Sequence, residues 1–176
     1  MRALKVLALV TDAFGGRGGI AQYNRDLLSA LVQGGTAASV AVVPRGAPDP
    51  AVPPAGITQV SPRLGRVAYV LTALRVAFGQ HFDVVLCGHL YMAPLAWLIA
   101  RLRGARLVVQ MHGIEAWPRP ARHRRAAVEA ADLILCVSRY TRARVLDWTA
   151  IAPERVQVLP NTVSAVFTPG DGSALR

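Results

Sequence analysis

Short apolar runs separated by amphipathic segments recur along most of the chain. Six of these runs have the length of β-strands and are apolar almost throughout: Leu4–Val10, Ser39–Val43, Asp83–Cys87, Arg106–Met111, Leu133–Val137 and Val156–Leu159. A weaker candidate is Ile57–Val60. Runs of this kind are typical of strands that are buried on both faces of a parallel sheet.

Helix-like segments lie between the runs. One apolar stripe at the 3.6-residue period consists of Ile20, Tyr23, Leu27, Leu28 and Leu31, and the two glycines after it predict the end of the helix. A second stripe consists of Leu64, Val67, Ala68, Leu71, Leu74 and Phe78. Further helices are expected over Tyr91–Arg103, Ala121–Ala131 and Arg139–Trp148, the last capped by Ser138.

This alternation predicts an α/β fold. We expect a Rossmann-like, doubly wound and mainly parallel sheet of about six or seven strands, with helices on both faces. Residues 1–160 would form this domain, and residues 161–176, which lose the periodicity, would be a linker or tail. The most apolar helical stretch, Tyr91 to Ala100, is shorter than the roughly 20 residues that a bilayer requires.

Composition narrows the class of protein. The chain has 176 residues, of which 53% are hydrophobic and 17% charged, as expected of a folded domain with a conventional core. Cys87 and Cys136 each end an apolar run, so we expect buried thiols in a reducing compartment rather than a disulfide framework. Since no signal-peptide cleavage site is visible, we expect a cytoplasmic protein. It would be either soluble or peripheral at the inner face of the membrane.

The charge is strongly and unevenly positive. The net charge is +10, and residues 101–144 hold ten arginines against Glu115, Glu129 and Asp132. Such a surface favours phosphate-rich partners, which are nucleic acid, anionic lipid headgroups or a phosphorylated substrate. Four arginines of one segment are candidates for contact with a membrane or a phosphate, with a solvated basic face as the alternative: Arg119, Arg122, Arg124 and Arg125.

A glycine-rich loop follows the first predicted strand. The sequence GRGGIA over residues 16–21 satisfies the dinucleotide-binding pattern, but five residues separate it from the strand and no acidic residue follows at the expected spacing. Arg45 stands near that place and would suit a 2′-phosphate, so an NADP-binding oxidoreductase stays an alternative. Gly18 and Gly19 precede a helix start, which predicts a site for a diphosphate.

Polar residues follow several of the other predicted strands. His89, His112, Ser138 and Asn161 each come directly after, or within two residues of, the end of a strand, and Glu115 follows His112 closely. Because the carboxyl ends of parallel strands meet at one edge of the sheet, we expect these side chains to gather there. A histidine at this edge suits donation to a developing oxyanion or a sugar hydroxyl, and a carboxylate suits hydroxyl recognition.

Four stretches in this order carry a resemblance to a known family: GGRGGIAQYNRDLLSAL, VVQMHGIEAW, AADLILCVSRYTRARV and PERVQVLPNTV. Over nearly its whole length the chain resembles the amino-terminal half of retaining glycosyltransferases of family 4, which have the GT-B fold. The resemblance implies two Rossmann-like domains facing each other across a cleft. The amino-terminal domain would bind a hydroxyl-bearing acceptor, and the carboxyl-terminal domain, absent from this chain, would bind the nucleotide-sugar donor.

The resemblance also assigns roles by position. Gly18 and Gly19 match the loop that approaches the donor diphosphate and the acceptor, and His112 matches a histidine that contacts the transferred sugar and supports catalysis. Asn161 matches a turn toward the second domain, where Thr162 and Ser164 depart from the family pattern. We expect transfer of a sugar with retained anomeric configuration, and no activity from the isolated chain.

No cofactor or metal is expected. The histidines and carboxylates are too scattered for a metal site, so arginines, backbone amides and helix starts would stabilise the leaving diphosphate. An alternative function is a free-standing basic Rossmann-like module that binds nucleic acid or anionic membrane. Because the chain lacks a nucleic-acid-binding motif, we expect no nucleic acid partner.

Overall fold

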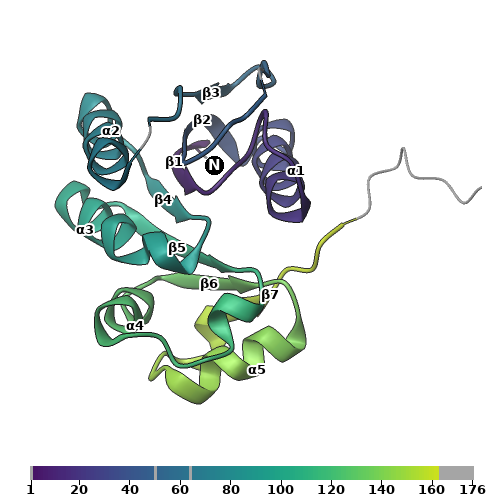
Figure 1. Ribbon diagram of the computed structural model, residues 1–176, viewed down its shortest axis with the longest axis vertical. Coiled ribbons are helices and arrows are strands. Elements are labelled where there is room, and N and C mark those ends of the chain that lie inside the picture. The colour runs from purple at the N-terminus through teal and green to yellow at the C-terminus, as the bar shows by residue number, and fades with distance from the viewer. Residues whose placement is uncertain (1, 50, 64, 163–176) are drawn as a thin grey trace, which may run out of the picture.

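Seven parallel strands form one sheet in the order β3-β2-β1-β4-β5-β6-β7 (Figure 1). The computed structural model describes residues 2–49, 51–63 and 65–162. The strands are β1 (Leu4–Val10), β2 (Ala37–Pro44), β3 (Ile57–Gln59), β4 (Val84–Cys87), β5 (Arg106–Met111), β6 (Leu133–Cys136) and β7 (Val156–Val158). All six expected strands and the weaker candidate are present, with ends that differ by at most two residues, and the predicted fold class is confirmed.

Helices cover both faces of the sheet. They are α1 (Gly19–Gln33), α2 (Arg66–Gly79), α3 (Ala93–Arg103), α4 (Arg122–Glu129) and α5 (Arg139–Trp148). In Figure 1, α1 lies on one side of the sheet and α2, α3 and α4 lie on the other. A larger core joins the sheet to α2, α3, α4 and α5, and a smaller one joins it to α1. Because both faces are covered, β1 is buried from Val6 to Val10.

The helix ends follow local sequence signals. Gly34 ends α1 by donating its N–H to the carbonyl of Ala30 at 2.9 Å, as expected. Ser138 caps α5, because its Oγ accepts a hydrogen bond from the N–H of Thr141 at 3.0 Å. The segment predicted as one helix from Tyr91 is divided into a 3₁₀ turn at Leu90–Met92 and α3, which has a proline in its first turn.

Only part of the second apolar stripe faces the core, where Leu74 packs. In α2, Val67, Leu71 and Phe78 are 73%, 61% and 53% exposed, while the buried residues are Tyr69, Ala73 and Ala77. Small alanines let the helix backbone lie close to its neighbours, which leaves the larger side chains outside. The stripe therefore predicted the helix correctly but not its orientation, and Leu64 lies outside the described residues.

The order of the strands determines at which edge of the sheet a ligand can bind. β1 lies between β2 and β4, so the chain runs outward in opposite directions from the β1–β4 pair. In an open parallel sheet this reversal opens a crevice at the carboxyl ends of the strands. The glycine loop follows β1, His89 follows β4 and His112 follows β5, so all three segments lie at this edge.

Candidate functional site

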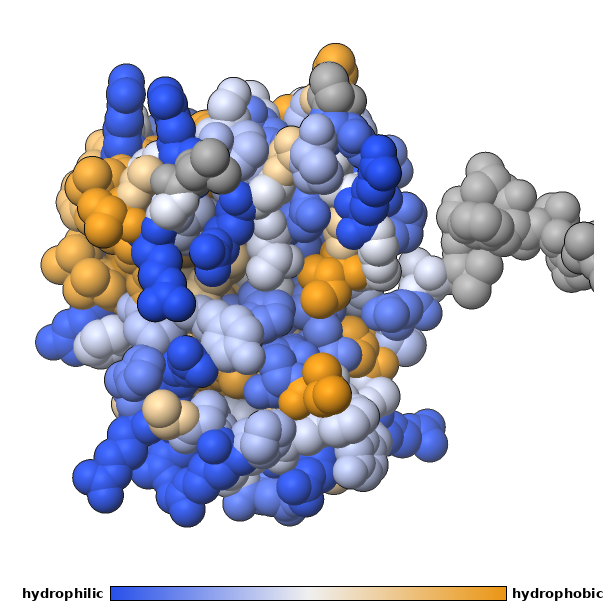
Figure 2. Space-filling model, in the orientation of Figure 1, coloured by the Kyte–Doolittle hydropathy of each residue, from blue (hydrophilic) through white to orange (hydrophobic). Residues whose placement is uncertain are grey.

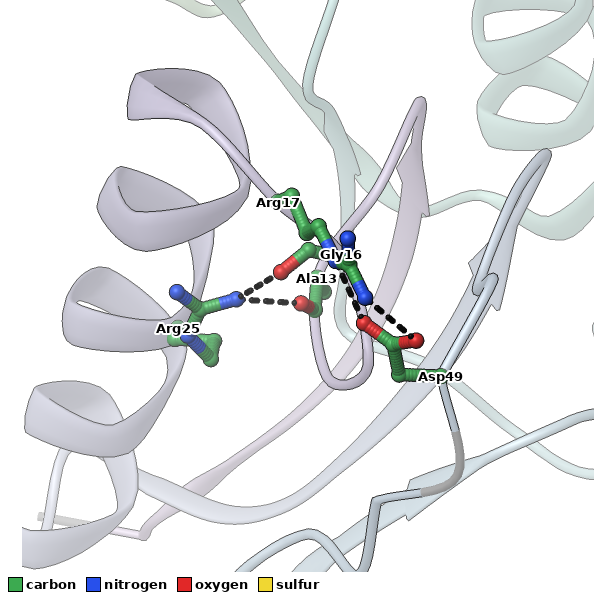
Figure 3. A network of polar contacts seen from close by, with 5 residues as sticks. All are labelled: Ala13, Gly16, Arg17, Arg25 and Asp49. Carbon is green, nitrogen blue, oxygen red and sulfur yellow. Dashed lines mark hydrogen bonds and ion pairs between the residues drawn. The ribbon is translucent and has the colours of Figure 1, made fainter.

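The glycine loop between β1 and α1 is held by side chains (Figure 3). Arg25 of α1 donates from Nη1 to the carbonyls of Ala13 and Gly16, each at 2.8 Å. On the other side of the loop, Arg17 forms a two-bond ion pair with Asp49 at 2.8 and 3.0 Å. These bonds occupy carbonyl groups of the loop and restrict its conformation, so the start of α1 has a defined position.

The first turn of α1 has donors to offer a ligand. Gly18 precedes the helix with φ of 88°, a conformation that glycine adopts without strain. No side chain caps this end, and its first turn contains no acidic residue. A Cβ on Gly18 or Gly19 would meet no described atom within 4 Å, so a ligand has room to approach the backbone. Open backbone N–H groups at a helix start suit an anion such as a diphosphate.

His112 is held directly after β5 by two contacts. Its Nε2 lies 2.9 Å from the carbonyl of Gly88, and its backbone N–H donates to Oε1 of Glu115. Since a carbonyl only accepts, Nε2 carries the hydrogen in the neutral ring, which leaves the lone pair on Nδ1. No hydrogen bond to Nδ1 is found within the described ranges. The neutral ring is therefore ready to accept a hydrogen bond from a hydroxyl, whereas donation from Nδ1 requires protonation.

Burial sets the charge state of this imidazole. Desolvation lowers the pKa of His112 from its ordinary value of 6.5, while the carbonyl of Gly88 and the carboxylate of Glu115 act in the opposite direction. The net direction is downward, so His112 is neutral at pH 7. Glu115 thus fixes the backbone of His112 and also favours a positive charge that develops on the ring.

His89 lies beside His112. Its Nδ1 accepts the N–H of Tyr91 at 3.3 Å, and its ring centroid is 6.3 Å from that of His112. Desolvation lowers the pKa of His89, the carboxylate of Glu115 raises it, and His112 and Arg124 lower it further. The structure thus brings together three of the predicted site residues, His89, His112 and Glu115.

Tyr23 connects this cluster to the glycine loop. It lies one turn inside α1, and its ring meets that of His112 edge to face with centroids 5.5 Å apart. Its hydroxyl lies 3.5 Å from the carbonyl of Leu159, just after β7. A cavity of about 290 Å³ is lined by Gly19, Tyr23 and Asn161 among others, so these two predicted residues lie close together.

Sequence reasoning did not identify Tyr23 as a site residue. It belongs to the apolar stripe of α1, and its side chain is 8% exposed, as the stripe predicts for a core residue. Its position one helical turn after the glycine loop is the signal that would have found it. The loop and His112 therefore lie at the same edge of the sheet, as the sugar-transfer interpretation requires.

The remaining predicted residues are separated. The Ser138 hydroxyl is engaged within the α5 cap, since it also donates to Oγ1 of Thr141 at 3.0 Å. Arg119, Arg122 and Arg125 line a shallow hollow beside the start of α4. The guanidinium of Arg124 instead lies 4.5 Å from the ring centroid of Tyr91, so the four arginines of the basic segment do not form one surface.

Metal-ligating clusters and membrane-spanning helices are both absent from the described residues. In the described part of the chain, no group of three or more histidine, cysteine or acidic residues is arranged to hold a metal ion. No helix there is both long and apolar enough to cross a bilayer. The expectation that the reaction needs no metal stays a prediction.

Comparisons with known proteins agree on the kind of domain. The family model described as Glycosyltransferase Family 4 matches residues 17–166. A search of curated protein sequences returns no match. Among solved structures, HepE from Anabaena in complex with UDP has a TM-score of 0.65 and 18% identity, covering 98% of this chain and 49% of that one.

Two other structures are similar in the same way. The apo form of the lipopolysaccharide outer core galactosyltransferase WaaB has a TM-score of 0.64 at 15% identity, covering 92% of this chain and 46% of that one. MnaA from S. aureus with UDP has a TM-score of 0.61 at 17% identity, covering 97% and 51%. These likenesses show a shared fold, and the chain spans about half the length of each structure.

Proposed function

The chain belongs to glycosyltransferase family 4, and we propose that it is the acceptor-side domain of a retaining glycosyltransferase. The whole enzyme moves a sugar from a nucleotide-diphosphate sugar to an acceptor hydroxyl. Its second Rossmann-like domain binds most of the donor, and the residues after Leu159 lead to it. Two of the similar structures contain UDP, which supports a nucleotide-sugar donor.

One observation carries this proposal. The open helix start at Gly18 and Gly19, the ring of Tyr23 and the ring of His112 follow one another along the carboxyl edge of the sheet. A diphosphate at the helix start would place the sugar attached to it near His112. Gly19 and Asn161 line the same cavity, and in this proposal the second domain closes the site beside Asn161.

The residues of this edge have separate roles in the proposed reaction. The N–H groups at the start of α1 stabilise negative charge on the leaving diphosphate. His112 orients a hydroxyl of the transferred sugar or the acceptor through Nδ1, and Glu115 holds the backbone that carries it. Glu115 also favours positive charge on His89 and His112 as the diphosphate leaves. Electrostatic stabilisation of this kind needs no metal.

Transfer activity tests the proposal. We would measure release of nucleoside diphosphate from a panel of nucleotide sugars, using this chain alone and this chain joined to the coding sequence that follows Arg176. We expect no turnover from the chain alone and turnover from the longer protein, unchanged by EDTA and lowered about a hundredfold or more by His112→Asn. A longer protein that lacks a second domain, or that is indifferent to His112→Asn, would contradict the proposal.

We also propose that the enzyme works at the inner face of an anionic membrane, docked through α2 and α3. Figure 2 shows apolar surface on the side where Figure 1 places these helices. It consists of Val67, Val70, Leu71, Phe78, Trp97, Leu98 and Leu102, each at least 36% exposed. The two helices contain four arginines and no acidic residue. Arg101 lies over the ring of Trp97 and Arg103 over that of Phe78.

This combination fits an anionic lipid surface. Arginine stems lie along apolar side chains while their guanidinium groups reach lipid phosphates, and an interfacial tryptophan suits the headgroup region. The basic segment at Arg119 and Arg122 would add attraction at longer range. The docking face is therefore assigned to α2 and α3 rather than to that segment.

Vesicle binding tests the docking face. We expect the chain to sediment with vesicles containing phosphatidylglycerol. The triple change Val67→Ser, Leu71→Ser and Leu102→Ser should lower the affinity for these vesicles more than tenfold, because each inserted apolar side chain contributes about 1–3 kcal/mol. Val52→Ser is the matched control, since Val52 is 94% exposed but lies on another part of the surface. Equal binding by the triple variant and the control would rule this face out.

A further inference from the structure

Three arginines surround a second cavity at the same edge of the sheet. The cavity has a volume of about 460 Å³, and its lining includes Arg45, Arg66 and Arg124 with Tyr69 and Tyr91. Apolar side chains complete the lining, and among the described residues no acidic one takes part in it. The three arginines come from the loop after β2, the first residue of α2 and the first turn of α4, so only the fold brings them together.

The guanidinium groups of these arginines are free for a ligand. Within the part of the chain that the structure describes, none of the three forms an ion pair or donates a side-chain hydrogen bond. Other arginines near this edge are occupied, as Arg17 and Arg25 are in the glycine loop. Three like charges around one cavity repel one another, and an anion held between them removes that cost.

A row of rings connects this cavity to His112. Arg124 lies over Tyr91 at 4.5 Å, and the ring centroid of Tyr91 is 4.8 Å from that of His89. The ring of His89 in turn neighbours that of His112 at 6.3 Å. A molecule with an anionic group in the cavity can therefore lie along Tyr91, at the end of a row of rings that continues through the buried His89 to His112. Tyr91 is 57% exposed, so its ring is accessible to such a molecule.

We propose that the acceptor carries a phosphate group and that Arg45, Arg66 and Arg124 bind it. This rests on the proposed function, since it names the class of acceptor for the same site. Guanidinium groups match phosphate oxygens with paired hydrogen bonds, and several of them around one cavity select an anion over a neutral sugar. The apolar part of the lining, which includes Val70 and Leu95, suits an acceptor whose phosphate is joined to an apolar group.

Direct binding tests this inference without any transfer activity. The first probe is glycerol 3-phosphate, titrated into the chain by calorimetry, with sodium chloride at the same ionic strength as a blank. The cavity variant combines Arg45→Gln, Arg66→Gln and Arg124→Gln. The control variant, with the same change in charge, combines Arg2→Gln, Arg106→Gln and Arg139→Gln, which are exposed and lie outside the cavity. Circular dichroism checks that both variants fold.

We expect the affinity of the cavity variant for glycerol 3-phosphate to fall about tenfold or more, because one lost hydrogen bond between charged groups is worth about that factor. The affinity of the control variant should fall less than about threefold. Vesicles of phosphatidylcholine with phosphatidic acid form the second arm. If the cavity variant loses affinity for glycerol 3-phosphate, the acceptor phosphate belongs to a soluble molecule. If it loses affinity only for the vesicles, the acceptor phosphate is a lipid headgroup.

Two results would overturn the inference. One is equal loss of affinity in both variants, which would mean general attraction by a basic protein. The other is absence of binding to both probes. The binding measurements use this chain alone and need no turnover, so the two proposals fail separately. A longer protein that is indifferent to His112→Asn contradicts the proposed function, whereas equal loss of phosphate affinity in the cavity and control variants contradicts only this inference.

Discussion

At the scale of single residues, Gly18 and Gly19 have different reasons for being glycine. Gly18 has a positive φ, so any other residue there would be strained. Gly19 is the first residue of α1, has no positive φ and has open space where a Cβ would lie. Nothing in the described part of the fold therefore requires glycine at position 19. A ligand that approaches the backbone would be a reason for glycine at this position.

The change Gly19→Ala separates folding from binding. We expect its thermal unfolding temperature to be unchanged or slightly raised, because alanine restricts the unfolded chain and favours a helix. We expect transfer by the longer protein to fall roughly ten- to a hundredfold, since a methyl group would displace the diphosphate. Gly79→Ala is the control, as Gly79 also has open space and no positive φ but lies at the far end of α2. Equal activities of the two variants would remove Gly19 from the site.

At the scale of elements, the start of α5 shows that a strand-end residue can also have a role in the fold. The Ser138 hydroxyl bonds to the backbone and side chain of Thr141, and Thr141 is 1% exposed. Beside it, the indole Nε1 of Trp117 lies 3.5 Å from Oγ1 of Thr141. The cap thus joins α5 to the segment after β5 that carries Glu115. Ser138 was predicted to bind substrate, and its contacts support a capping role.

Two changes at Ser138 distinguish these roles. We expect Ser138→Ala to lower the free energy of unfolding by about 1 kcal/mol, because the N–H of Thr141 loses its partner. Ser138→Thr keeps a capping hydroxyl and should restore most of that stability. Urea unfolding of the three proteins measures both effects. If transfer by the longer protein falls in Ser138→Ala by more than the loss of stability explains and Ser138→Thr restores it, the hydroxyl contacts substrate as well.

At the scale of the whole molecule, the histidine cluster links stability to pH. His89 and His112 follow different strands, and Tyr23 of α1 packs against His112, so only the complete fold buries the two imidazoles. Burial lowers the pKa of both rings, and Arg124 lowers that of His89 further, while Glu115 partly offsets the effect. Protonation therefore favours the unfolded chain, in which histidine titrates near its ordinary value of 6.5.

The stability of the fold should decrease as the solution is acidified. Above pH 6.5 both states hold neutral histidines, and the full stability is present. Between pH 6.5 and the lower folded-state pKa values, the unfolded chain binds more protons, so each histidine lowers the free energy of unfolding by up to about 1.4 kcal/mol per pH unit. The double variant His89→Gln and His112→Asn should flatten this slope in urea unfolding, whereas His123→Gln, an exposed control, should not.

Much of the architecture was predictable from the order of residues. Strands covered on both faces must be apolar throughout, so Leu4–Val10 and Arg106–Met111 were located to the residue. Parallel strands share one carboxyl edge, so His89, His112 and Glu115 were expected together and are found together. The linker predicted after residue 160 falls mostly outside the described residues, and its role stays a prediction.

What the order of residues could not determine depends on neighbours distant in sequence. A helix with apolar residues on several sides, such as α2, has no single preferred face, and packing of Ala73 and Ala77 decided which side was buried. The contact of Tyr23 with His112 and the meeting of Arg45, Arg66 and Arg124 depend on strand order. Local patterns report burial along a segment, whereas a binding site needs side chains from several segments at one place, and only the packed sheet brings them there.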